Sequence, residues 1–310
     1  MKRREFIQRT LAGSAAISLM NWSACQDPDG KRSLGKTGEK LSIIGFGGIL
    51  VRDEPQSAAN ELVARAFEQG INYFDVAPTY GNAEEKLGPA LEPYRKNAFL
   101  ACKTNKRDKA GAQQELEESL RKLRTDHFDL YQLHAITTPE DVETAFGPEG
   151  AMQVFVKARQ EGKVRFLGFS AHSERAALMA MQRFDFDTIL FPINFVCWYK
   201  GDFGPKVVQK AKEKEMGILA LKSMAHTRLA KEESRPYKKC WYRPIIDDHI
   251  ADLSVRFTLS QGTTAAVPPG ESPFFWKALE IAQKYQPLTK EENQEVQKLA
   301  KDVEPLFKTT

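Results

Sequence analysis

From about residue 31 onward, short apolar runs alternate with stretches in which apolar residues recur at helical spacing. In the stretch 110–124, for example, Leu116, Leu120 and Leu123 share one face, and charged residues occupy the other. The runs predict strands at 41–47, 71–77, 98–103, 128–134, 164–169, 187–193, 217–222 and 263–268. The periodic stretches predict helices at 57–69, 83–93, 110–124, 151–161, 173–183, 203–215, 245–260 and 273–285, and a last helix over 289–307.

Eight strand–helix units indicate a parallel sheet with helical crossovers, which is an α/β architecture. Eight units within 310 residues favour closure into a (β/α)8 TIM barrel, whose usual length is about 250 residues. An open doubly wound sheet has the same local pattern, but no G-x-G-x-x-G joins a strand to a helix here. We therefore expect a single barrel domain over 31–310, with an extra C-terminal helix.

Composition narrows the possible functions. The chain is 42% apolar and 28% charged with a net charge of +4, and its acids and bases are interspersed, so we expect no nucleic-acid partner. The four cysteines, Cys25, Cys102, Cys197 and Cys240, form no C-x-x-C and have no histidine at zinc spacing. We therefore expect no metal site, and we expect unpaired thiols.

Residues 1–30 have the layout of an export signal and linker: a basic head followed by a short, weakly apolar stretch. Arg3-Arg4-x-Phe-Ile resembles the twin-arginine signal, which the twin-arginine export machinery reads. Ser-Ala-Cys25 resembles the end of a lipoprotein signal, although Trp22 departs from that pattern. Simple cleavage, or an amphipathic helix of the folded protein, remains open. The expected location is periplasmic or membrane-anchored outside the cytoplasm, and cytoplasmic if the signal is unused.

Polar residues with catalytic chemistry stand at the ends of three successive predicted strands. Asp75 ends the second run and Tyr80 lies in the following loop, while Lys103 and His134 end the third and fourth runs. Active residues of a barrel gather at the carboxyl ends of its strands. The sequence therefore predicts that these four side chains converge on one rim.

These residues stand in motifs that closely resemble the aldo-keto reductase superfamily. The motifs are Gly-Ile-Asn-Tyr-Phe-Asp-x-Ala-x-x-Tyr-Gly at 70–81, the strand-ending Lys103, and Asp-Leu-Tyr-x-x-His at 129–134. They stand within a likeness that runs from about residue 32 to residue 270. The resemblance implies an NAD(P)(H)-dependent enzyme that interconverts a carbonyl and an alcohol. Tyr80 would be the general acid and base, Lys103 would stabilise its phenolate, Asp75 would hold Lys103, and His134 would orient the substrate oxygen.

The same resemblance implies a dinucleotide site and a substrate pocket. The implied cofactor residues are Gly47, Gly48, Asp75, Ser170, Asn194, Ser223, Gly270, Glu271 and Ser272. Glu271 stands where a phosphate contact is expected, which favours NAD over NADP. Lys222 replaces the aromatic residue that the family often stacks on the nicotinamide. Aromatic loop residues suggest a pocket for sugars or aromatic aldehydes, or plain loop anchoring; those assigned to the pocket are Phe46, Trp198, Tyr199 and Tyr242.

Two alternatives stay open at this point. One is a non-catalytic or regulatory ligand-binding barrel with a degenerate cofactor site, because the adenosine-binding loop departs from the family pattern. The other is unrelated chemistry on the same scaffold, because a fold does not fix a function.

Overall fold

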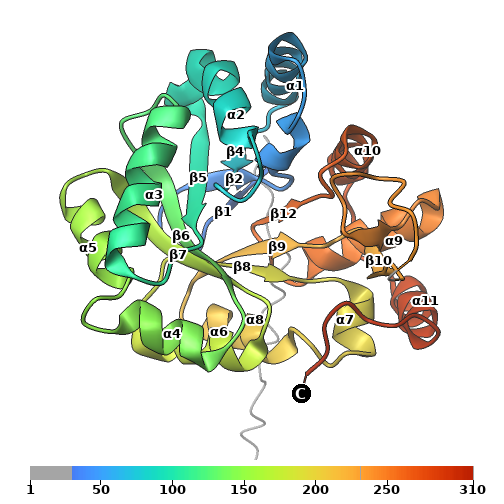
Figure 1. Cartoon of the computed structure of the whole chain (residues 1–310). Helices are drawn as coiled ribbons and strands as arrows, with labels where there is room; N and C mark the ends of the chain where they lie inside the picture. Colours follow the sequence, from blue (N-terminus) through green and yellow to red (C-terminus); the bar gives the residue numbers. More distant parts are fainter. Residues whose placement is uncertain (1–29, 231, 310) are drawn as a thin grey trace, which may run out of the picture.

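In the computed structural model, which describes residues 30–230 and 232–309, helices surround a sheet of eight parallel strands (Figure 1). The strand order is β12-β9-β8-β7-β6-β5-β4-β3. Ile44 bridges Ala266 in parallel, and Gly45 N donates to Ala266 O at 2.9 Å, which joins the two edges. The strands are β3 (Phe46–Gly47), β4 (Tyr73–Asp75), β5 (Phe99–Thr104), β6 (Phe128–Ile136), β7 (Val164–Ala171), β8 (Thr188–Pro192), β9 (Gly217–Leu221) and β12 (Ala265–Val267). The predicted (β/α)8 barrel is confirmed.

The helices lie outside this sheet and link successive strands (Figure 1). None of the described helices is long and apolar enough to cross a membrane. Their bounds are α1 (Gln56–Glu68), α2 (Ala83–Leu91), α3 (Lys109–Lys122), α4 (Pro139–Phe146), α5 (Met152–Gln160), α6 (Glu174–Arg183), α7 (Phe195–Tyr199), α8 (Pro205–Glu213), α9 (Asp248–Ser260), α10 (Ser272–Gln283) and α11 (Lys290–Lys301), with the 3-10 helices η1 (Gly48–Val51) and η2 (Glu92–Asn97).

The core has an outer layer between strands and helices and an inner layer inside the barrel. The inner residues of the barrel strands come from alternate positions, since successive side chains of a strand point to opposite faces. Leu34 and Leu41 join them from the segment before β3. The inner layer consists of Leu34, Leu41, Tyr73, Phe99, Ala101, Leu130, Leu190, Leu219, Ala265 and Val267. The barrel interior is therefore packed, and function must be sought at its ends.

The predicted strand at 41–47 is wrong as one element. Its first part pairs in an antiparallel hairpin of β1 (Lys31–Ser33) with β2 (Lys40–Ser42), whereas residues 44–47 join the barrel, of which Phe46–Gly47 form β3. Gly45 lies between the two parts, at a point where a Cβ atom would lie 2.4 Å from the Tyr73 ring. The hairpin covers the amino-terminal end of the barrel, where Arg32 donates to the carbonyl groups of Leu259 and Thr263 at 2.8 and 2.9 Å.

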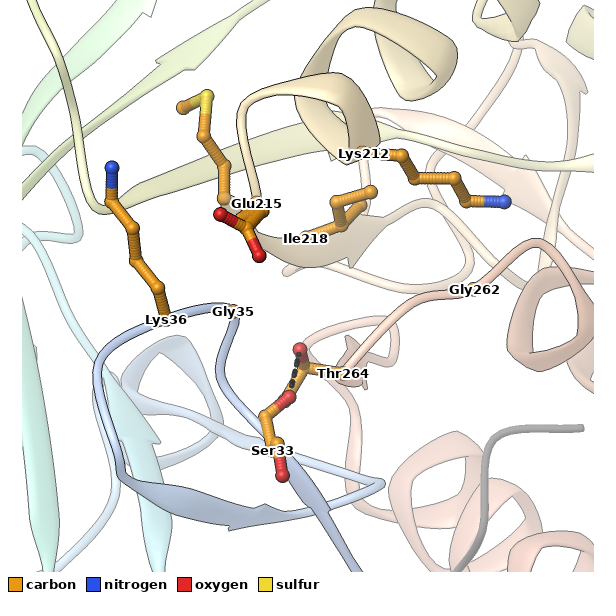
Figure 2. Close-up of a pocket in the computed structure, with 9 residues that line it drawn as sticks. Ser33, Gly35, Lys36, Lys212, Glu215, Ile218, Gly262 and Thr264 are labelled. Atoms are coloured by element: carbon orange, nitrogen blue, oxygen red, sulfur yellow. Dashed lines mark hydrogen bonds between the residues drawn. The ribbon is translucent and has the colours of Figure 1, made fainter. Parts of the chain in front are cut away.

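A cavity of about 270 Å³ lies beside this hairpin, between the turn before β9 and the turn before β12 (Figure 2). Thr264 Oγ1 donates to Ser33 O at 2.9 Å on its wall, and Lys36 and Lys212 point away from each other. Lys36 pairs with Asp185 at 2.8 Å. The cavity lies at the amino-terminal ends of the strands, opposite the end where barrels carry catalytic groups.

A second hairpin stands at the carboxyl-terminal end. It consists of β10 (Ala225–Arg228) and β11 (Tyr242–Pro244). The C-terminal segment after α11 binds it, because Thr227 Oγ1 donates to Glu304 O and Arg228 Nη2 to Leu306 O, both at 2.9 Å. The hairpin and its loop therefore stand over the rim where the predicted site lies. The predicted export signal and the possible lipid on Cys25 lie outside the described residues.

Candidate active site

Three neighbouring parallel strands bring the predicted catalytic residues to one rim. Asp75 is the last residue of β4, Lys103 lies near the end of β5, and His134 lies near the end of β6. Register places Asp75 opposite Ala101 and Lys103 opposite Gln132. The strands, which the apolar runs predicted, and their register, which the structure adds, therefore position the site.

A buried ion pair joins Asp75 to Lys103. The Lys103 ammonium donates to Asp75 Oδ1 and, at 3.1 Å, to the carbonyl oxygen of Val76. Asp75 Oδ2 accepts from Tyr73 Oη and Gln132 Nε2, both at 3.2 Å. Burial lowers the pKa of Lys103, but neighbouring Asp75 and Tyr80 outweigh burial and raise it overall. Lys103 is therefore a fixed cation at neutral pH.

Tyr80 lies beside this cation, with Lys103 Nζ 5.3 Å from the centre of its ring. Burial raises the pKa of Tyr80, and the Lys103 charge opposes that rise without cancelling it. The phenol is therefore protonated at neutral pH, and Lys103 makes its loss of a proton less costly than burial alone would.

His134 faces Tyr80 across the rim, with ring centres 5.9 Å apart and rings nearly perpendicular. Its Nδ1 lies 3.4 Å from Thr79 Oγ1. Burial and the nearby Lys103 charge hold the pKa of His134 well below 6.5, so the ring is neutral at pH 7. Arg107 fixes the backbone here by donating to the His134 and Ala135 carbonyl oxygens at 2.7 and 3.2 Å.

A cavity of about 140 Å³ opens between these residues and the loop that joins β10 to β11. Five of its lining residues were assigned to the site from sequence, namely Gly47, Asp75, Tyr80, Tyr242 and Gly270. The others are Ile49, Leu221, Lys222, Lys239, Trp241, Val267 and Pro268. No sequence pattern placed Lys239 at this site. Its loop reaches across to η1, where Lys239 Nζ donates to Leu50 O at 2.7 Å, and Nζ also pairs with Glu54 at 2.9 Å.

Several features of the wall fit the nicotinamide end of a dinucleotide. Ser223 follows the lining residue Lys222 directly, and its buried Oγ has no hydrogen-bond partner within the described chain, which leaves a donor and an acceptor for an amide. At Gly270 a Cβ atom would come within 2.4 Å of Ile49, so only glycine leaves this part of the wall open. Aromatic and aliphatic side chains supply the remaining apolar surface.

Other implied cofactor residues are occupied within the chain. Ser170 Oγ accepts from Ala135 N at 2.7 Å. Asn194 accepts from Cys197 N at 2.9 Å, capping α7, and donates to Lys222 O at 3.3 Å. Glu271 accepts from Lys239 N at 2.8 Å. These three residues therefore shape the rim through contacts with the backbone. The other two implied cofactor residues are the first residues of helices, Gly48 of η1 and Ser272 of α10.

Three residues assigned to the substrate pocket lie elsewhere. Phe46 is fully buried, with its ring centre 5.4 Å from those of Phe74 and Phe275, so it belongs to the core. Trp198 and Tyr199 are in α7, a short helix that the sequence analysis did not predict. Their ring centres lie 5.9 and 5.5 Å from that of Phe257. Of the four aromatic residues assigned to the substrate pocket, Tyr242 is the one that lines the cavity.

The fold and this site define a (β/α)8-barrel protein in which a tyrosine, a lysine–aspartate pair and a neutral histidine converge at the strand ends. The model of the Aldo/keto reductase family matches residues 43–302, and the chain belongs to that family. It is 32% identical over 155 residues to the uncharacterized oxidoreductase YqkF of Bacillus subtilis, covering 46% of this chain and 48% of that protein. It is 34% identical over 155 residues to L-galactose dehydrogenase of Arabidopsis thaliana, covering 45% and 47%.

The chain spans about half the length of the curated relatives it matches. Two solved structures share its fold. The holo form of aldo-keto reductase AKR11C1 from Bacillus halodurans has a TM-score of 0.69 at 23% identity, covering 89% of this chain and 97% of that one. Glycerol dehydrogenase AKR11B4 from Gluconobacter oxydans has a TM-score of 0.66 at 20% identity, covering 91% and 99%.

Proposed function

We propose that this protein is an NAD(P)(H)-dependent oxidoreductase that interconverts a carbonyl compound and an alcohol, with Tyr80 as general acid and base. One observation carries the proposal. The Lys103 ammonium is held by the Asp75 carboxylate beside the ring of Tyr80, which lines the cavity and faces the ring of neutral His134. This arrangement serves a reaction that needs one proton at a buried oxygen.

In this mechanism the chain handles the proton. A bound reduced dinucleotide would supply hydride, so that carbonyl, NAD(P)H and a proton give alcohol and NAD(P)⁺. Tyr80 donates its hydroxyl proton to the developing alkoxide, and Lys103 stabilises the resulting phenolate until solvent reprotonates it. Asp75 holds Lys103 in place. Neutral His134 hydrogen-bonds the substrate oxygen and orients it toward Tyr80.

For the cofactor we propose NAD in preference to NADP. Glu271 follows Gly270, which lines the cavity. An acidic side chain favours a free ribose hydroxyl over a ribose phosphate. For the substrate, a sugar or polyol is supported by the 34% identity to L-galactose dehydrogenase and by the Trp241 and Tyr242 rings beside the polar groups.

Carbonyl-dependent oxidation of NADH and NADPH by the purified protein tests this function. We expect turnover on some members of a panel of aldehydes, ketones and oxidised sugars, with NADH the better donor. Dinucleotide binding by fluorescence is measured in parallel. Binding without turnover on any member would favour the non-catalytic barrel instead, and turnover with NADPH at lower KM would contradict the preference for NAD.

We also propose export through the twin-arginine machinery. This rests on the Arg3-Arg4 pair and the short weakly apolar stretch after it. That route carries folded proteins, so a dinucleotide could be bound before export.

A further inference from the structure

Lys222 is a further cation at the active-site cavity. It follows β9 directly, and its side chain lines the same cavity as Tyr80 and Asp75. Its backbone has φ +69°, a left-handed conformation that is uncommon for a residue with a side chain. Its carbonyl accepts from Ala225 N at 2.9 Å and from Asn194 Nδ2 at 3.3 Å. The surrounding contacts therefore hold lysine in an unfavourable backbone state at the site.

The other two lysines at the site are each neutralised by a carboxylate. Lys103 pairs with Asp75, and Lys239 pairs with Glu54 at 2.9 Å. Within residues 30–230 and 232–309, no carboxylate pairs with Lys222. The Asp75 carboxylate on the same cavity already binds Lys103.

Aromatic rings, rather than an anion, surround the Lys222 ammonium. Nζ lies 4.8 Å from the ring centre of Tyr242 and 5.2 Å from that of Trp241. Such faces attract a cation but leave its charge uncompensated. Burial lowers the pKa of Lys222 to about 8, so the group is mainly charged at pH 7 and carries a desolvation cost. An anion bound here would remove part of that cost.

The position of this cation indicates which molecule carries the anion. Tyr80 and Lys222 line one cavity of about 140 Å³, which is about five times the 30 Å³ that one water occupies in the liquid. An oxygen receiving the Tyr80 proton and a group that contacts Lys222 would therefore occupy the same small cavity. Neutral His134 supplies no charge of its own.

We propose that Lys222 binds a carboxylate of the substrate, so that the enzyme acts on carbonyl compounds and alcohols that bear an acid group near the reacting carbon. Keto acids, aldehyde acids and sugar acids are the chemical class. This inference rests on the proposed function for its reaction. The pyrophosphate of the cofactor is also an oxyanion that Lys222 could bind. The experiment below distinguishes a substrate carboxylate from the cofactor pyrophosphate.

The test compares substrates that are matched except for charge. Glyoxylate is paired with glycolaldehyde, succinic semialdehyde with butanal, and D-glucuronate with D-glucose. For wild type we expect kcat/KM to favour the acid at least tenfold in one or more pairs. Lys222→Met should lower kcat/KM for the acids about 10- to 100-fold more than for their neutral partners, the effect of one lost charge-assisted hydrogen bond.

Two variants control for charge. Lys222→Arg keeps the cation and should retain the preference for the acid. Lys239→Met also removes one positive charge from the cavity wall, but one already paired with Glu54, so it should not erase the preference. An unchanged acid-to-neutral ratio in Lys222→Met would overturn the proposal. A loss of NADH affinity in Lys222→Met that matches its loss in kcat/KM would also overturn it, because the anion would then be a cofactor phosphate.

A binding measurement separates failure of this inference from failure of the proposed function. Trp241 lies beside Lys222, so oxalate binding should change tryptophan fluorescence in wild type and not in Lys222→Met or Trp241→Phe. Oxalate binding that depends on Lys222, in a protein that turns over no carbonyl, would uphold the anion site and refute the enzyme. Turnover without charge preference and without oxalate binding would refute the anion site and leave the enzyme standing.

Discussion

The buried pair of Asp75 and Lys103 makes a quantitative prediction about stability. The two residues are 1% and 0% exposed, so neither charge reaches solvent. Removing one partner of a buried ion pair leaves an uncompensated charge and costs about 3–5 kcal/mol, whereas replacing both partners by neutral groups is often nearly free. The single variants Lys103→Met and Asp75→Asn should therefore each lower the free energy of unfolding. The double variant should lower it by less than the sum of the two single losses.

The contacts of each partner set the order of the two effects. In Lys103→Met the carboxylate keeps its bonds from Tyr73 and Gln132, both at 3.2 Å, so we expect a loss near 3 kcal/mol. In Asp75→Asn the ammonium keeps the Val76 carbonyl at 3.1 Å but loses its counter-charge, and we expect a loss nearer 5 kcal/mol. The double variant should fall short of the sum by at least about 2 kcal/mol.

Urea unfolding at pH 7, followed by tryptophan fluorescence, measures these free energies. The exposed pair Arg183–Glu143 is the matched control, and breaking it with Arg183→Met should change the free energy of unfolding by no more than about 1 kcal/mol. Additive losses in the double variant, or single losses as small as the control, would refute the view that the two charges depend on each other.

Two further predictions concern acid stability and export. Burial lowers the pKa of His172 from 6.5 to about 4. Between these pH values the unfolded chain binds more protons than the folded chain, so the protein loses stability as the pH is lowered from 6.5 to 4. The loss is up to about 3 kcal/mol, at about 1.4 kcal/mol per pKa unit, and urea midpoints of His172→Gln should decline less between pH 6.5 and 4; an equal decline would contradict the assignment. Replacing Arg3-Arg4 by Lys-Lys should leave the protein in the cytoplasm, as judged by cell fractionation, and unchanged export would remove the twin-arginine proposal.

Apolar runs located the barrel strands because a buried parallel strand needs a continuous apolar segment. The same reasoning failed at 41–47, where two different strands share one apolar run. Ser42 Oγ donates to Ile44 O at 2.8 Å, which marks the bend between them. Helix α4 was missed although Thr138 and Asp141 form a capping box that the sequence shows.

The site was predictable where strand ends define it and unpredictable where distant loops complete it. Asp75 and Lys103 follow from strand ends and parallel register. Lys239 reaches the cavity through a loop that contacts η1, a segment 189 positions away at Leu50, and local sequence holds no signal for that contact. The aromatic residues after β8 pointed to the pocket by proximity, but Asn194 caps a short helix that places Trp198 against the core instead.

The central claim is that the Tyr80 hydroxyl delivers the proton. Turnover by Tyr80→Phe, measured at saturating carbonyl and dinucleotide beside the dinucleotide dissociation constant, tests it most directly. The account predicts a fall in kcat of about 10²- to 10⁴-fold, the usual contribution of a positioned general acid, with the dissociation constant unchanged within about threefold. A variant that keeps a tenth or more of wild-type kcat would show that the proton comes from another group.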